Sequence, residues 1–198
     1  MARPAHFTHD DVLDAAMACV AATGPNVSVA DIARQLGGPV GSIYHRFTSR
    51  DVLVIRLWLR SVQRFQAGLF EIAETMDDPH EAMIAMALHI PQYCRTHQDE
   101  AVSLTLFRQE RLLTACPAGV RDAVAGVNGP VTAIMLELTQ RRYGRLTAEN
   151  RQWALMATQV APFGLVRPHL GGPVPRHVDD AVVASTDAIL RLGDRTDS

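Results

Sequence analysis

The sequence contains no lysine, so all 19 of its basic residues are arginines. Every basic contact of the chain therefore uses a planar guanidinium, which can bind a carboxylate or a phosphate through two parallel hydrogen bonds. Cysteine is also scarce, since Cys19, Cys94 and Cys116 are the only three and lie far apart. An odd number of widely spaced cysteines excludes a disulfide scaffold and predicts a reducing, cytoplasmic location.

Motifs for metals, cofactors and catalysis are missing as well. The sequence has no Cys-x-x-Cys pair, which excludes a zinc finger, and we expect neither a metal nor a cofactor. It has no GxSxG, no phosphate-binding loop and no GxGxxG after a strand, so we predict that the protein is not an enzyme. No hydrophobic run reaches the roughly 18 residues of a membrane span, and no secretory signal is recognisable.

The overall composition is that of a folded protein. The chain has 198 residues, of which 47% are hydrophobic and 20% are charged, and these values fit one or two globular domains. The formal net charge is −2. Bulk charge therefore gives no indication of nucleic-acid binding, and any such binding must depend on where individual charges lie.

Apolar residues recur with a helical period along most of the chain, and no segment shows the alternation of a half-buried strand. We therefore predict an all-α fold. Glycine and proline mark the ends of the helices, as at Gly24-Pro25 and Gly37-Gly38-Pro39. The predicted helices cover about 8–23, 28–36, 39–47, 48–76, 79–97, 100–113, 118–143 (one or two helices around Asn128-Gly129-Pro130), 147–166 and 177–192, and the segment 167–175 is expected to be a loop.

The break at Gly37-Gly38-Pro39 joins two short helices, which is the pattern of a helix-turn-helix. Small residues, among them Ala33 and Gly41, would let the two helices cross closely. The second helix of such a pair can enter a DNA major groove about 12 Å wide. The alternative is an ordinary helical hairpin inside a bundle, but Tyr44 and His45 fit a core poorly.

Residues 12–53 resemble the DNA-binding domain of TetR-type transcriptional regulators. The resemblance rests on Leu13-Asp14-Ala15-Ala16, on Asp31-Ile32-Ala33 and above all on the run from Gly41 to Arg50. In that family a tyrosine and a basic residue at the start of the fourth helix contact phosphate, and these roles fall on Tyr44 and Arg50. The residues expected at DNA are Ser28, Val29, Pro39, Val40, Gly41, Ser42, Tyr44, His45, Arg46 and Arg50.

The segment departs from the family pattern at three neighbouring positions. Gly38 stands where an apolar residue usually anchors the turn, Pro39 replaces the usual capping serine or threonine, and Val40 replaces a commonly polar or basic residue. Up to residue 50 the charges also cancel, with four arginines against four aspartates. We therefore expect arginines, including Arg3, to face phosphate while the aspartates point away.

The resemblance implies two domains. Residues 1–48 are expected to form a three-helix helix-turn-helix domain, and residues 49–198 a helical bundle that binds a ligand and dimerises. The second part is rich in methionine and aromatic residues, which suit an adaptable apolar pocket, although ordinary core packing is the alternative for each of them. The expected pocket residues are Phe65, Met86, His89, Tyr93, Phe107, Met135, Trp153 and Met156.

Three of the polar and aromatic residues follow one stripe of a helix. His89, Tyr93 and His97 are spaced by four residues, so they share a face. They either hold polar groups of a ligand or form a partly solvated seam. A metal site with Cys94 is the least favoured reading, because no acidic ligand lies nearby in the sequence.

The last predicted helix carries small residues at a helical spacing, which lets another helix approach closely. In the family the final two helices of each subunit form a four-helix dimer interface, whereas packing within one chain is the alternative. The expected interface residues are Leu155, Gln159, Phe163, Ala181, Ala184, Ala188 and Leu192.

Together these features predict a homodimeric regulator that binds double-stranded operator DNA. Its expected role is that of a repressor which a small apolar effector releases from the operator. Two alternatives stay open. One is a protein that binds or sequesters a small molecule and keeps a vestigial helix-turn-helix. The other is a helical scaffold that acts through protein partners.

Overall fold

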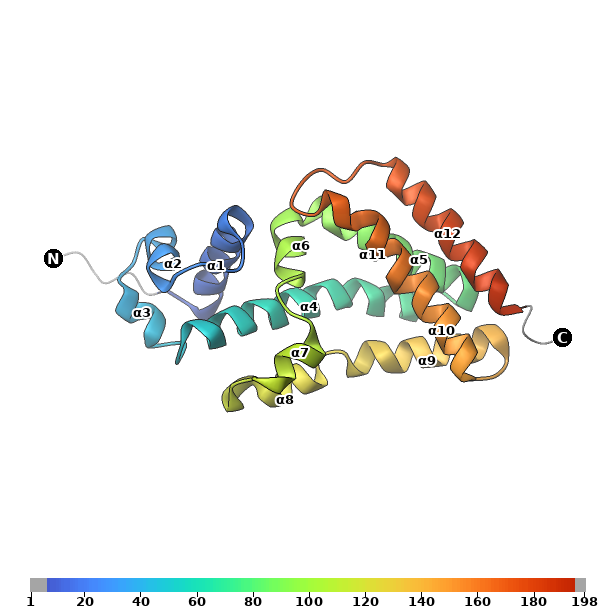
Figure 1. Cartoon of the computed structure of the whole chain (residues 1–198), viewed down its shortest axis with the longest axis horizontal. Helices are drawn as coiled ribbons and strands as arrows, with labels where there is room; N and C mark the ends of the chain where they lie inside the picture. Colours follow the sequence, from blue (N-terminus) through green and yellow to red (C-terminus); the bar gives the residue numbers. More distant parts are fainter. Residues whose placement is uncertain (1–6, 195–198) are drawn as a thin grey trace. The chain divides into compact units, whose positions relative to one another are not determined.

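The computed structural model describes residues 7–194, which Figure 1 shows as a succession of helices. No β-strand occurs within these residues, and the predicted all-α fold is confirmed. In the same range no helix combines the length and apolar character needed to cross a membrane. Arg3, one of the arginines expected at phosphate, lies outside the described residues.

The described residues form two compact units. Unit one comprises residues 7–63 and 99–127, and unit two comprises residues 64–98 and 128–194. The predicted boundary at residue 48, between a DNA-binding and a ligand-binding domain, stays a prediction. By packing, the first part of the fourth helix and residues 99–127 belong with the N-terminal helices.

Unit one begins with three short helices and the first part of a long one. Capping boxes fix the starts of the first two helices, Thr8 with Asp11 and Ser28 with Asp31. Each reciprocal pair satisfies backbone amides that a helix leaves free at its first turn. The helices are α1 (His9–Thr23), α2 (Val29–Leu36), α3 (Val40–Tyr44) and α4 (Arg50–Thr75).

The facing sides of these helices bury a common core. Val12, Ile32, Ile43 and Leu53, one from each helix, are almost completely buried. Burying a side chain of this size contributes about 1.5–3 kcal/mol relative to exposing it. This core holds α3 in place, because a helix of five residues is not stable by itself.

Residues 99–127 complete unit one with a second core. Phe107 meets Trp58 of α4 edge-on, with ring centroids 6.0 Å apart, and Val120 and Val124 are buried against the same side of α4. The helices of this part are α6 (Gln98–Leu104), α7 (Gln109–Thr114) and α8 (Ala118–Gly126).

Unit two combines the remainder of α4 with the helices of residues 64–98 and 128–194. Leu69, Met83, Leu138 and Leu190, from four different helices, form its core. Figure 1 shows α12 beside α11 and α5. The helices are α5 (Pro79–Thr96), α9 (Gly129–Tyr143), α10 (Ala148–Leu155), α11 (Ala161–Val166) and α12 (His177–Gly193).

Several boundaries differ from the prediction for local reasons. The helix predicted over 39–47 ends at Tyr44, because the carbonyl of Ile43 accepts bonds from both Arg46 and Phe47 as the chain bends to bury Phe47. The helix predicted over 100–113 is interrupted after Leu104. There the hydroxyl of Thr105 donates to the carbonyl of Val102, a side-chain bond that competes with helix continuation.

The helix predicted over 147–166 is continuous but not regular. Met156–Val160 form a π-helix between α10 and α11. Pro162 has no amide to donate to the carbonyl of Thr158, and the helix widens just before it. The predicted loop 167–175 also begins with a short 3-10 turn, Arg167–His169. Of the one or two helices expected over 118–143, the structure has two, α8 and α9.

Candidate nucleic-acid interface

Helix α3 has one buried and one exposed side. Ile43 and Phe47 are almost completely buried, whereas Tyr44 is 53% exposed and Val40 is 39% exposed. His45, which follows the helix, is also exposed. The core therefore holds α3 by one side while Val40, Tyr44 and His45 face outward. A hairpin buried in a bundle would place these side chains inside.

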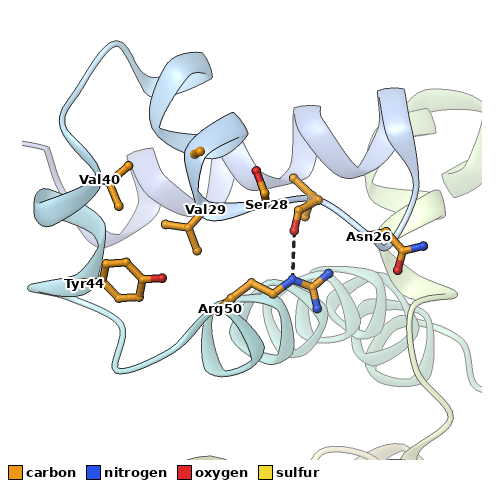
Figure 2. A pocket seen from close by; sticks show the side chains of 8 residues that line it. Asn26, Ser28, Val29, Val40, Tyr44 and Arg50 are labelled. Atoms are coloured by element: carbon orange, nitrogen blue, oxygen red, sulfur yellow. Dashed lines mark hydrogen bonds between the residues drawn. The ribbon is translucent and has the colours of Figure 1, made fainter.

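An open groove of about 570 Å³ lies beside this exposed side. Figure 2 shows Val40 and Tyr44 on one flank, with Ser28 and Arg50 farther along. The groove brings together the loop after α1, the start of α2, the exposed side of α3 and the start of α4. Its lining residues are Asn26, Val27, Ser28, Val29, Ala30, Val40, Tyr44 and Arg50.

The start of α2 contributes backbone donors to this groove. Ser28 caps the helix by accepting a hydrogen bond from the amide of Asp31 at 3.1 Å. The earlier amides of the first turn, those of Val29 and Ala30, have no partner within a helix, and such amides can donate to an anion. Hydrogen bonds from Ser28 and the guanidinium of Arg34 keep the pKa of the Asp31 carboxyl below its usual range. Asp31 is therefore ionised, and Arg34 offsets its charge at 2.9 Å.

Arg50 faces the groove but is bound to the protein itself. Its Nε donates to the carbonyl of Val27 at 2.9 Å, the bond drawn in Figure 2, and its Nη2 donates to the carbonyl of Pro25. Its Nη1 pairs with Asp51 at 3.2 Å. Arg50 thus holds the loop between α1 and α2 against α4. A positioning role for Arg50 fits this geometry better than the phosphate contact that the family resemblance implied.

Arg46 is engaged in the same way. Its Nη1 donates to the carbonyl of Ser42 at 2.8 Å, and its Nη2 donates to the carbonyl of Phe7. The side chain is only partly exposed. Of the two arginines expected at phosphate within the described residues, neither has a free guanidinium.

The remaining predicted DNA residues divide by exposure. Pro39 and Gly41 are exposed and Ser42 is partly exposed. Val29 was also expected at DNA, and its side chain is buried in the first core of unit one. A branched side chain at the first position of α2 fills the core, so Val29 can offer DNA only its backbone amide.

The stripe of His89, Tyr93 and His97 forms a cluster of rings with Phe65 in unit two. The ring centroid of Phe65 lies 4.9 Å from that of His89 and 5.3 Å from that of Tyr93. Tyr93 stacks on His97 with ring centroids 4.4 Å apart. His89 Nε2 bonds to the carbonyl of Phe65 at 3.0 Å. Burial lowers the pKa of His89, so the imidazole is neutral at pH 7. Within residues 7–194 no three potential ligands gather into a metal site.

The eight residues expected at an effector are divided between the two units. Phe107 packs in unit one, whereas the other seven belong to unit two. Met86 is buried in the core of unit two and Met135 packs against it. The indole nitrogen of Trp153 is buried without a hydrogen-bond partner. The expected role of Phe107 at an effector stays a prediction, and its packing beside Trp58 could not be foreseen from the sequence.

A second groove, of about 490 Å³, lies between α4 and α9 in unit two. Apolar side chains line it, and two carboxylates stand among them. None of its residues was expected at a ligand, because along the sequence they look like ordinary helix surface. They are Phe70, Ala73, Glu74, Pro130, Ile134 and Glu137.

The residues expected at a dimer interface are all exposed. Leu155 and Phe163 are each 44% exposed, and Val160 between them is 59% exposed. Leu165, Val183 and Leu192 add further exposed apolar side chains on α11 and α12. Packing within the chain therefore leaves this apolar face uncovered.

Residues 12–57 match the family model described as "Bacterial regulatory proteins, tetR family". Among curated proteins, no match is found. Solved structures resemble the chain over nearly its whole length. A TetR-like transcriptional regulator from Rhodococcus sp. RHA1 has a TM-score of 0.70 at 17% identity, over 98% of this chain and 99% of that one.

Two further structures resemble the chain to a similar degree. The transcriptional regulator FadR from Bacillus subtilis, solved with stearoyl-CoA, has a TM-score of 0.63 at 17% identity, over 94% of this chain and 97% of that one. SmeT, the repressor of a Stenotrophomonas maltophilia multidrug efflux pump, has a TM-score of 0.68 at 17% identity, over 94% and 90%. At these identities the likeness establishes the fold.

Proposed function

We propose, on the premise that this chain is a TetR-type transcriptional regulator, that it acts as a homodimeric repressor which a small, mostly apolar molecule releases from a palindromic operator. The observation that carries the proposal is the exposed side of α3 beside an open groove. Val40, Tyr44 and His45 face solvent there although the helix is only five residues long. A side chain as large as tyrosine at such a position is available to a partner.

The two flanks of the groove suit different parts of a duplex. The hydroxyl of Tyr44 and the first-turn amides of α2 can donate to one row of phosphates, which fixes the register of the protein on DNA. The same docking turns α3 into the major groove, where Val40 can contact a thymine methyl and His45 can bond to a base edge.

The charges of unit one are compatible with this docking. Asp10 and Asp14 pair with Arg60 of α4, at 3.3 and 2.7 Å. The one positive charge of Arg60 offsets part of the negative charge of this pair. Because Arg46 and Arg50 bind backbone carbonyls, one copy offers few unbound guanidinium groups to phosphate. Two copies on two half-sites offer twice as many contacts.

The continuity of α4 supports the proposed release. The helix starts directly after the segment that follows α3, and Leu69 near its other end lies in the core of unit two. An effector that binds differently to two positions of α4 therefore changes the spacing of the two α3 helices. Half-sites lie about 34–36 Å apart, so a shift of a few ångströms weakens binding.

The test is a fluorescence-anisotropy titration of purified protein against duplex DNA from upstream of its own gene, at two salt concentrations. Specific binding that weakens as salt rises supports the proposal, because binding to phosphates releases counterions. Absent or salt-insensitive binding overturns it and favours the alternative of a small-molecule binding protein with a vestigial helix-turn-helix.

A further inference from the structure

The turn between α2 and α3 has no side chain at Gly38, and the ring of Phe7 occupies that place. A Cβ atom built on Gly38 would lie 2.5 Å from Cε2 of Phe7, well inside the roughly 3.5–4.0 Å at which carbon atoms pack. The ring therefore rests directly on the backbone of the turn. Phe7 is partly buried by this contact, although it precedes the first helix.

Arg46 connects the same segment to α3 through hydrogen bonds. One guanidinium bonds to the carbonyl of Phe7, which lies before α1, and to the carbonyl of Ser42, which lies inside α3. Hydrogen bonds from Thr8 lower the pKa of Asp11, and the positive charge of Arg46 adds to this effect. The charge of Arg46 is thus directed toward the start of α1.

Helix α3 needs such support. Its N-cap, Pro39, makes no side-chain capping bond, and five residues form too few backbone bonds to outweigh the cost of starting a helix. The position of α3 must therefore come from contacts outside it. Ile43 anchors α3 in the buried core, and Phe7 covers the turn that leads into the helix.

We propose that Phe7, Gly38 and Arg46 form a lock that positions α3 for reading DNA, an inference that rests on the proposed function. Phe7 and Arg46 act in it as positioning residues. Gly38 leaves the space that the ring of Phe7 fills. Arg46 then makes no phosphate contact, in contrast to the expectation from the sequence.

A swap of side chains tests the lock. Phe7→Ala uncovers the turn, and Gly38→Leu expels the ring of Phe7. Each change alone is expected to weaken binding roughly ten-fold. The double variant is expected to bind more tightly than either single variant, because the new leucine covers the turn that the ring has left. The probe is a duplex selected by the wild-type protein from a randomised pool.

Two additional readouts are needed. The salt dependence of binding separates a positioning role of Arg46 from a phosphate contact, and amide exchange tests the lock without any DNA. Arg46→Gln is expected to weaken binding without changing the salt slope, whereas losing a phosphate contact lowers that slope by about one. Without DNA, amide exchange at Ser42 and Ile43 is expected to be roughly ten-fold faster in Phe7→Ala.

The lock is overturned if Phe7→Ala exchanges these amides at the wild-type rate, if the double variant is as weak as the two single effects combined, or if Arg46→Gln lowers the salt slope. If the wild-type protein selects no duplex, the proposed function fails. The exchange rates then still decide whether the lock holds α3.

Discussion

At the scale of single residues, the exposed tyrosine of α3 is the most informative side chain. Tyr44 is 53% exposed and lines the groove, so its removal should not disturb the core. We expect Tyr44→Ala to weaken binding to a selected duplex roughly ten-fold, about 1.4 kcal/mol. The free energy of unfolding should change by less than about 0.5 kcal/mol, as for other surface substitutions.

Anisotropy titrations and urea denaturation measure the two effects. Tyr44→Phe separates the hydroxyl from the ring, and Leu146→Ala, at an exposed position in unit two, is the matched surface control. Equal affinity of Tyr44→Ala and the wild-type protein would remove Tyr44 from the interface.

His89 gives a second prediction at this scale. A Cβ atom built on Gly68 would lie 2.3 Å from Cε1 of His89, so Gly68→Ala must push the imidazole away from the carbonyl of Phe65. We expect the displaced imidazole to be more exposed. Burial, the largest influence on the pKa of His89, holds it below 6.5 against the raising effect of the bond to Phe65, so relief of burial should move the pKa up toward that value. NMR titration of the imidazole measures it.

The sign of the associated pH effect follows from the lowered pKa. A histidine that the fold keeps neutral contributes stability above its unfolded pKa of about 6.5, and this contribution is lost as the pH falls through the lower folded value. Gly68→Ala should flatten this part of the stability profile. Gly126→Ala, where an added Cβ meets nothing within 4 Å, is the matched control and should leave the pKa of His89 unchanged.

The exposed positions around α3 were accessible to sequence reasoning because helix period and family resemblance agree there. The hydrogen bonds of Arg46 and Arg50 were not. Both guanidiniums bind backbone carbonyls from residues that are 23 or more positions away. No pattern along the chain indicates which carbonyls a folded loop will present to an arginine.

At the scale of helices, the capping carboxylates predict how stability responds to acid. Asp11, Asp31 and Asp78 accept hydrogen bonds at helix starts, which lower the pKa of each below the usual 3.8. Their contribution is present above that unfolded value and is lost as the pH falls through the lower folded values. We expect the free energy of unfolding to fall as the pH is lowered through this range.

Urea denaturation at about pH 5 and about pH 3 measures the change. Asp31→Asn removes one titrating group while keeping a side chain that can cap a helix, so its loss of stability with acid should be smaller than that of the wild-type protein. Identical pH dependence in both proteins would show that the carboxylate of Asp31 contributes nothing.

Helix existence followed from the sequence more readily than helix ends. The capping residues Thr8, Ser28 and Thr147 start helices as their side chains predict. The short α3 and the interruption after Leu104 did not follow, because both depend on tertiary contacts. The chain bends after Tyr44 so that Phe47 is buried, and after Leu104 the side chain of Thr105 competes for a backbone carbonyl.

At the scale of the whole molecule, the uncovered apolar face of α10 to α12 predicts dimerisation. A stable interface buries about 800 Å² on each partner, and a charge at its centre is not tolerated without a partner. We expect Phe163→Asp to be monomeric at concentrations where the wild-type protein is dimeric. Analytical ultracentrifugation measures this.

Leu146→Asp provides the matched control, since Leu146 is 42% exposed, against 44% for Phe163, but lies outside the predicted interface. It should remain dimeric. A monomeric wild-type protein, or equal dissociation of both variants, would exclude this face as the dimer contact. Because two half-sites must be read together, Phe163→Asp should also lose DNA affinity.

The central claim is that two copies of α3 face one duplex, and their separation tests it most directly. A spin label attached through Thr48→Cys, at an exposed position just after α3 that is not proposed to contact DNA, reports the distance between the two copies. Cys19→Ser removes the half-buried thiol. When the protein is bound to a selected duplex, the labels should lie about 34–36 Å apart, which is one DNA turn, after correction for the length of the label. Labels whose separation on the duplex matches no DNA turn would contradict the account.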